Sequence, residues 1–104
     1  MEIKGYAILD KAIQRHPQTK GWLTTWRQTV EDAAWTNLME VREMFPSADG
    51  VSIRSGQGKI VVTIFNVGGN NYRLLTRINY RRQQVTVLDV LTHAEYDKEL
   101  WKNL

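Results

Sequence analysis

The fold is decided by the stretch FNVGGNNYRLLTRINY, which runs from Phe65 to Tyr80. Its glycines and asparagines between residues 67 and 71 tolerate positive φ, so they predict a tight connection between two strands. The residues that follow alternate between two faces, as in a strand. One face would carry Tyr72, Leu74, Thr76, Ile78 and Tyr80, and the other Arg73, Leu75, Arg77 and Asn79.

Strands and turns are expected on both sides of this stretch. Residues 59–65 are β-branched and apolar on both faces, which is typical of a buried central strand. A turn at 55–58 precedes them, with an edge strand expected at 51–54. Residues 81–83 turn the chain again, and residues 84–91, rich in Val and Leu, predict a further strand. Together they form an antiparallel meander.

Three helices are predicted ahead of the meander. Residues 6–15 have helical periodicity and end before Pro17. Residues 19–34 place Trp22, Trp26 and Val30 on one stripe, where tryptophans are expected in the core. A third helix begins at Asn37, which starts an N-x-x-E capping pattern, and Pro46 stops it. With a short terminal helix, the order predicts an α+β fold of two to three helices packed on a small antiparallel sheet.

Length and composition limit what the chain can be. With 104 residues it is expected to form a single domain, residues 1–104. No apolar run reaches the roughly 18 residues of a membrane span, and the N-terminus lacks a secretory signal. The absence of cysteine fits a reducing cytoplasm, where we expect the protein to act. With only two histidines, neither a metal site nor a cofactor is expected.

Charge is distributed unevenly along the sequence. The chain has a net charge of +3, yet residues 50–88 hold no acidic residue and six basic ones: Arg54, Lys59, Arg73, Arg77, Arg81 and Arg82. This asymmetry predicts a positive surface on the sheet and an acidic helical side. Such a surface suits a polyanion, so the candidate RNA-binding residues here are Arg54, Lys59, Arg77, Arg81 and Arg82. The alternative is that solvated arginines merely keep the sheet from aggregating.

Residues suited to acid–base chemistry gather at the end of the meander. Thr92-His-Ala-Glu95 has the form of a capping box, so the last helix should begin at Thr92 with His93 in its first turn. Tyr96 and Asp97 follow on the same side of that turn. In a hairpin about residues 81–83, Arg73 would lie beside the end of the last strand, near His93.

This combination suits RNA cleavage by the ribose 2′-hydroxyl, which needs a base, an acid and cations. Histidine can serve as acid or base, and the arginine fork suits phosphate oxygens. Tyr96 could act as base if arginines lowered its pKa, or stack on a nucleobase. Asp97 would orient His93 or interact with the helix dipole rather than perform chemistry. Individually, however, His93 could be an ordinary surface residue, Tyr96 a packing residue and Arg73 a solvated strand residue.

Two blocks, FNVGGN-x-YRL (residues 65–74) and THAEYDK (residues 92–98), resemble the HigB-type toxins of bacterial type II toxin–antitoxin systems, in the RelE/ParE superfamily. The likeness extends to Arg15-His-Pro17, Trp26, the region around Trp35 and Phe45-Pro-Ser47. It implies a RelE-like fold and an endoribonuclease (mRNA interferase) that cleaves mRNA, commonly within translating ribosomes. It also implies a helix-turn-helix antitoxin (HigA-like), through which alone the toxin would reach operator DNA.

By position, the resemblance implies that Arg73 stabilises the phosphate and transition state, His93 is the acid/base, and Tyr96 stacks or transfers a proton. Lys98, Lys59 and Arg77 are expected RNA contacts. The chain departs from the usual pattern at Gly68-Gly69, away from the expected chemistry. Two other functions stay open: a ParE-like toxin that acts on DNA gyrase, and a catalytically silent RNA-binding module.

Overall fold

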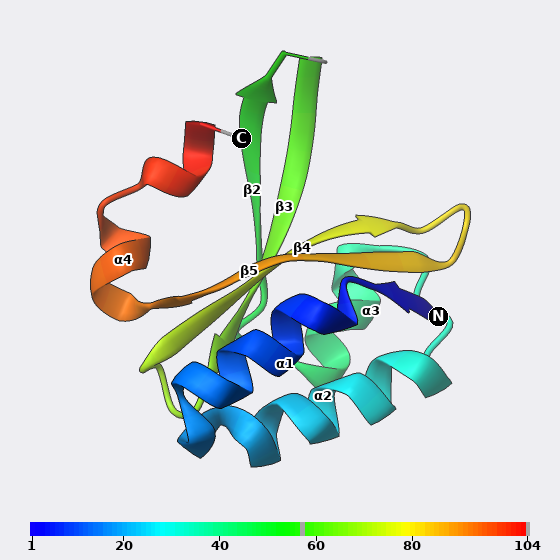
Figure 1. Cartoon of the computed structure of the whole chain (residues 1–104). Coiled ribbons are helices and arrows are strands. Elements are labelled where there is room, and N and C mark those ends of the chain that lie inside the picture. Colours follow the sequence, from blue (N-terminus) through cyan, green and yellow to red (C-terminus); the bar gives the residue numbers. More distant parts are fainter. Residues whose placement is uncertain (57, 104) are drawn as a thin grey trace.

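A computed structural model describes residues 1–56 and 58–103, and over these residues the chain forms one five-stranded sheet with helices on it (Figure 1). The strand order is β1-β5-β4-β3-β2, so β4 is central. Strands β2 to β5 pair antiparallel, whereas β1 pairs parallel with β5. The strands are β1 (Glu2–Lys4), β2 (Asp49–Ser55), β3 (Gly58–Val67), β4 (Tyr72–Asn79) and β5 (Gln84–Thr92).

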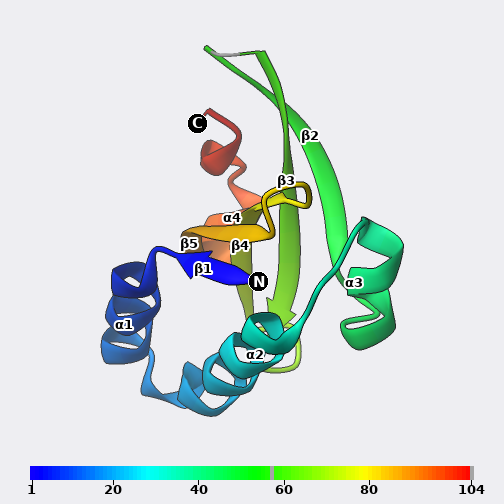
Figure 2. The same ribbon diagram turned by 90° about the vertical axis from the view of Figure 1, so that its right-hand side faces the viewer.

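The helices form two groups, on either side of the sheet. The first three are α1 (Tyr6–Arg15), α2 (Lys20–Asp32) and α3 (Leu38–Met44), and the last is α4 (His93–Asp97). Figure 2 shows α1, α2 and α3 wrapped around one side, while α4 and the C-terminal 3-10 turn (Leu100–Asn103) lie away from them. This arrangement confirms the predicted α+β class.

Local signals account for most boundaries. Helix α1 has the predicted bounds, and Asn37 caps α3 by accepting a hydrogen bond from the Glu40 amide at 3.0 Å. Helix α2 is shorter than predicted, because Pro17–Thr19 form a 3-10 turn and Ala33 is already extended. Strand β1 was not predicted, since three residues show no periodicity and its partner β5 lies about eighty residues away along the chain.

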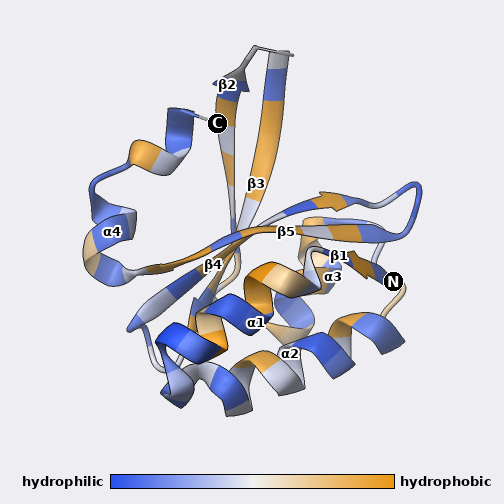
Figure 3. Cartoon of the chain, in the orientation of Figure 1, coloured by the Kyte–Doolittle hydropathy of each residue, from blue (hydrophilic) through white to orange (hydrophobic). Residues whose placement is uncertain are grey.

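Both faces of the sheet bury apolar side chains, which form two clusters. Figure 3 shows the apolar residues along β3 and β5. Leu74 packs in the larger cluster under the helices with Trp26 and Phe65. Its neighbour Leu75 packs on the opposite face with Ile64 and Trp101. The predicted alternation of β4 is therefore confirmed. Strand β3 is internal as expected but not central, and it is buried only from Val62 onward.

A β-bulge in β5 changes which of its residues face away from the helices. Leu75 pairs with Asp89 but Thr76 pairs with Val87, so Leu88 is the extra residue. Beyond a bulge the alternation shifts, and Val87 and Val90 both face the helices. Leu91 consequently faces the other side, next to Arg73 in the pairing.

In the part of the chain that the structure describes, no helix is long and apolar enough to cross a membrane.

Candidate active site

The start of β4, the end of β5 and α4 meet at one end of the sheet. Tyr72 pairs with Thr92, and Arg73 pairs with Leu91. The His93 amide donates a hydrogen bond to the Asn71 carbonyl at 3.0 Å, which ties α4 to the β3–β4 turn. That turn has positive φ at Gly68, Gly69 and Asn70, as predicted. The expected position of Arg73 beside the end of the last strand is confirmed.

Helix α4 begins with the predicted capping box. The Glu95 amide donates to Thr92 Oγ1 at 3.1 Å, and the Thr92 amide donates to Glu95 Oε1 at 2.9 Å. The hydrogen bond from the Thr92 amide holds the pKa of Glu95 below its ordinary value of 4.5, and the charges of Arg15 and His16 act in the same direction. The cap fixes where α4 leaves the sheet, and so where His93 lies.

The Glu95 cap predicts an acid-sensitive contribution to stability. Because the pKa is lower in the folded chain, this contribution is complete above about pH 4.5 and is lost as the pH falls through the folded value. We expect wild type to have a higher Tm than Glu95→Gln at pH 7, and the difference to vanish in acid. Thermal melts of both proteins from pH 7 to pH 3 test this. A difference that stays constant over that range would contradict the assignment.

Arg73 is a buried cation, with 9% of its surface exposed. Its Nη1 donates to the carbonyls of Asn70 at 3.0 Å and Tyr72 at 3.1 Å. Among the described residues it has no carboxylate partner, and its Nε and Nη2 donors make no hydrogen bond. Its Cζ lies 5.4 Å from the centre of the Tyr96 ring. The solvated-arginine interpretation is therefore wrong for this residue.

Tyr96 is packed between Arg73 and Trp101. Its ring stacks on Trp101 with centroids 5.2 Å apart and an interplanar angle of 12°, and Trp101 Nε1 donates to the Tyr96 carbonyl at 3.1 Å. Burial raises the pKa of the Tyr96 phenol above 10.0, Arg73 opposes this and Asp49 reinforces it. The net direction is upward, which disfavours Tyr96 as a base at neutral pH. One ring face is also already covered by Trp101.

His93 lies on the outer side of α4, with about half of its side chain exposed. Its Nδ1 is 2.8 Å from Asp97 Oδ2, the contact that was expected to orient the imidazole. Asp97 therefore contacts His93, whereas Glu95 belongs to the Thr92 cap. Across residues 1–56 and 58–103 no group of three or more His, Asp or Glu side chains is placed to hold a metal ion.

The remaining basic residues are not gathered at this site. Arg77 is exposed four residues along β4, about 13 Å from Arg73. Arg81 and Arg82 lie in the β4–β5 turn at the opposite end of the sheet, and Arg54 pairs with Lys59 near the tip of the β2–β3 hairpin (Figure 1). From strand lengths both pairs are roughly 25 Å from Arg73. The basic residues are therefore spread along β4, the β4–β5 turn and the β2–β3 hairpin rather than gathered at the candidate site.

Lys98 does lie close by. It lines a cleft of about 370 Å³ with Leu91, Glu95 and Trp101, among others. Trp101 is the main residue that the sequence analysis did not single out. An aromatic five residues after Tyr96 would not share its helical face, but Glu99 has a positive φ of 58°, after which the chain enters the 3-10 turn that carries Trp101. The sequence does not predict this left-handed backbone conformation, because a non-glycine residue adopts it.

A second group lies on the helical side of the same sheet end. The His16 and Tyr72 rings are 4.8 Å apart, and Gln18 Nε2 donates a hydrogen bond to the Tyr72 hydroxyl. His16 and Arg15 lie close enough to Glu95 to lower its pKa. The Arg15-His-Pro17 segment is thereby anchored against the candidate active site.

Comparison with known proteins identifies the family. The chain matches the model of the HigB toxin, the RelE-like toxic component of a toxin–antitoxin system, over residues 19–99. The chain belongs to the HigB toxin family. It is 28% identical over 89 residues to the mRNA interferase toxin HigB of Escherichia coli (strain K12) and to the mRNA interferase HigB of Shigella flexneri, covering 86% of this chain and 81% of each relative.

A further HigB relative covers still more of the chain. The mRNA interferase HigB of Escherichia coli O6:H1 is 26% identical over 98 residues, which is 94% of this chain and 90% of the relative. The matched family region contains both sequence blocks on which the resemblance rested, and the RelE-like fold that they implied is confirmed. As a toxin of such a system, this HigB-family chain has an antitoxin partner.

Proposed function

We propose that this HigB-family toxin is an endoribonuclease, an mRNA interferase, with Arg73, His93 and Tyr96 at its active site. The buried Arg73 guanidinium carries the proposal, because it has no carboxylate partner in the described chain. A buried cation without a counter-charge favours an anion, and the edge formed by Nε and Nη2 suits two phosphate oxygens. The relatives named as mRNA interferases support RNA as that anion.

In the proposed reaction the ribose 2′-hydroxyl gives up its proton to a base as its oxygen attacks the adjacent phosphorus, and the departing 5′-oxygen takes up a proton from an acid. The products are a 2′,3′-cyclic phosphate and a 5′-hydroxyl end. His93, oriented by Asp97, transfers the proton as base or as acid. Arg73 stabilises the extra charge on the phosphorus centre. Tyr96, protonated because its pKa is raised, donates a hydrogen bond to the phosphate. The mechanism needs no metal ion.

The scattered basic residues favour a large RNA substrate. Lys98 lies close enough to contact a phosphate that flanks the cleaved bond, and Arg77, about 13 Å from Arg73, would contact the RNA backbone further along. Arg54, Lys59 and the Arg81–Arg82 pair are too distant for a short RNA at the site, but they suit a particle such as the ribosome. We therefore propose cleavage of mRNA on translating ribosomes, in the cytoplasm. Neutralisation would come from a helix-turn-helix antitoxin, which alone would contact operator DNA.

The chemistry of the product ends tests this proposal. We expect a translation reaction with the purified toxin to yield fragments with a 2′,3′-cyclic phosphate, and a 2′-deoxy substitution at the cleaved nucleotide to abolish the cut. Products with 5′-phosphate ends would contradict the proposed attack. Intact RNA with an induced SOS response in cells would indicate a gyrase toxin. Intact RNA with salt-dependent RNA binding alone would indicate the silent binding module.

A further inference from the structure

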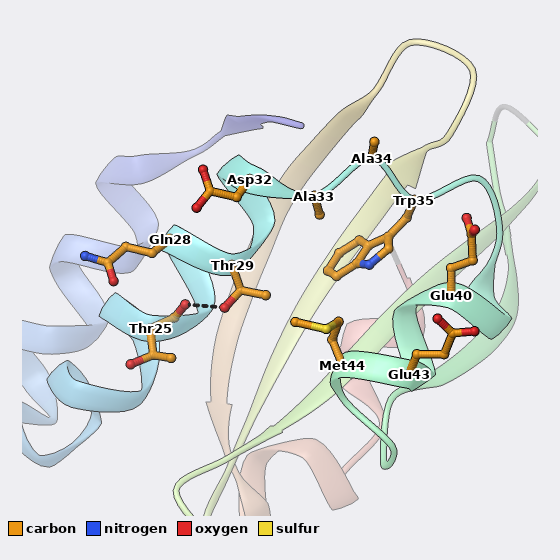
Figure 4. Close-up of a pocket in the computed structure, with 10 residues that line it drawn as sticks. All are labelled: Thr25, Gln28, Thr29, Asp32, Ala33, Ala34, Trp35, Glu40, Glu43 and Met44. Atoms are coloured by element: carbon orange, nitrogen blue, oxygen red, sulfur yellow. Dashed lines mark hydrogen bonds between the residues drawn. The ribbon is translucent and has the colours of Figure 1, made fainter.

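A groove of about 590 Å³ lies on the helical side of the molecule, between α2 and α3 (Figure 4). Its apolar part is formed by Ala33, Trp35 and Met44, and the close-up shows Trp35 and Met44 directed toward each other between the two helices. Met44 is 58% exposed. The volume falls within the range of roughly 300–1,000 Å³ that is typical of ligand sites. Met39, on the same helix, is 73% exposed.

The rim of this groove is acidic. Asp32 lies at the end of α2, and Glu40 and Glu43 lie on α3, with no basic residue among those that line the groove. Within the described chain, the side chains of Asp32 and Glu43 make no hydrogen bond or ion pair. Glu40 Oε1 accepts from the Thr36 amide at 2.5 Å and from its hydroxyl at 2.7 Å, which holds the pKa of Glu40 below 4.5.

The basic residue of α3 does not neutralise these carboxylates. Arg42 Nε donates to the Ala48 carbonyl at 2.8 Å, and its Nη2 lies 3.4 Å from Asp49 Oδ1. It is therefore directed toward the start of β2 rather than into the groove. Three carboxylates beside the exposed Met44 remain without a positive partner in the described chain, and Trp35, which is 5% exposed, lines the same groove. Such a surface complements a segment that combines cationic and apolar side chains.

RNA does not fit this groove, because its phosphates would be repelled. A second copy of the chain fits poorly as well. Its basic patches lie on other surfaces, so the contact would be heterologous and would continue into an open chain of molecules. The family assignment supplies a third protein partner, the antitoxin. Helix-in-groove docking uses the combination found here, an apolar strip flanked by charge.

We propose that the groove between α2 and α3 binds a basic, amphipathic segment of the antitoxin, with apolar side chains over Trp35 and Met44 and lysine or arginine side chains against Asp32, Glu40 and Glu43. This docking site rests on the assigned toxin–antitoxin role and not on RNA cleavage. The groove lies between α2 and α3 on the helical side of the molecule. Tyr96 packs on the opposite face of the sheet, where alternation along β4 also places Arg73 with Leu75. Changes in the groove should therefore leave the activity of the free toxin intact.

Charge reversal with a matched control tests the site. The variants are Asp32→Lys and Glu43→Lys, and the control is Asp10→Lys, which makes the same change at an exposed position on α1. Affinity for the purified antitoxin of the same operon is measured by calorimetry. We expect each groove variant to bind about 10-fold or more weakly, and the control to stay within about twofold. Added salt should weaken the wild-type complex.

Each outcome decides the proposal. Unchanged affinity in both groove variants would overturn it, and so would a wild-type toxin that self-associates through the groove and becomes monomeric in the variants. RNA cleavage by the same free proteins is measured in parallel, so the two proposals fail separately. Loss of binding in folded groove variants supports the docking site whether or not the chain cleaves RNA. Normal RNA cleavage together with undiminished antitoxin binding by the groove variants would contradict the docking site and leave the RNA-cleavage proposal intact.

Discussion

Replacing Arg73 by alanine is expected to lower the rate of RNA cleavage by about 10²–10³-fold, the size of effect that follows removal of one donor to a transition-state oxyanion. The reason is that the Arg73 charge is buried and its Nε–Nη2 edge makes no hydrogen bond among the described residues, so in the proposed mechanism it is available to the phosphate. The measurement is the cleavage rate of a fixed mRNA at saturating toxin, so that weaker binding does not hide the chemical step.

Arg54→Ala is the matched control for this substitution. Arg54 is exposed near the hairpin tip, so its loss should weaken contact with the RNA backbone and leave the chemical step alone. Arg73→Lys keeps the charge without the planar fork, and an intermediate rate is expected. Thermal melts of all three variants establish that they fold. Equal losses of rate for Arg73→Ala and Arg54→Ala would show that the active centre is wrongly assigned.

Replacing Trp26 by alanine is expected to lower the free energy of unfolding by about 3–5 kcal/mol. Trp26 has no exposed surface, and its ring meets Phe65 edge to face with centroids 5.6 Å apart. It connects α2 to β3 at the centre of the larger core cluster. Since small domains are stable by only about 5–15 kcal/mol, the variant should unfold at much lower urea concentration.

Trp26→Phe separates packing from hydrogen bonding at this site. Trp26 Nε1 is buried without a hydrogen-bond partner in the described chain. Phenylalanine keeps most of the ring volume and removes that unpaired donor, so its cost should be clearly smaller than that of alanine. Urea unfolding curves of both variants provide the comparison. A Trp26→Ala protein as stable as wild type would show that this face of α2 does not hold the core together.

The elements that the sequence predicts correctly are those with strong local signals. Pro17 limits α1, Asn37 and Thr92 supply side-chain caps, and glycines with Asn70 supply the positive φ of the β3–β4 turn. Alternation in β4 placed Leu74 and Leu75 on opposite faces, as the two core clusters confirm. Each of these features depends on neighbours within about four residues, so the sequence carries it directly.

Features that depend on distant contacts were missed. Strand β1 exists only because it pairs with β5, and the bulge in β5 depends on how two strands register. The six basic residues of the meander lie apart because its hairpins are long. Counting charges along the sequence does not show how far apart they lie in space. Trp101 joins the site after the positive φ at Glu99, and its ring stacks on Tyr96, whose pKa is raised by burial.

The central claim, an RNA-cleaving site that includes His93, is tested most directly by induction in bacteria followed by primer-extension mapping of transcripts. Wild type is compared with His93→Ala, which removes the imidazole but leaves the Thr92–Glu95 cap of α4. We predict in-frame cuts in translated mRNA with wild type and their disappearance with folded His93→Ala. Growth arrest with intact mRNA, or the same cuts from the variant, would contradict the claim.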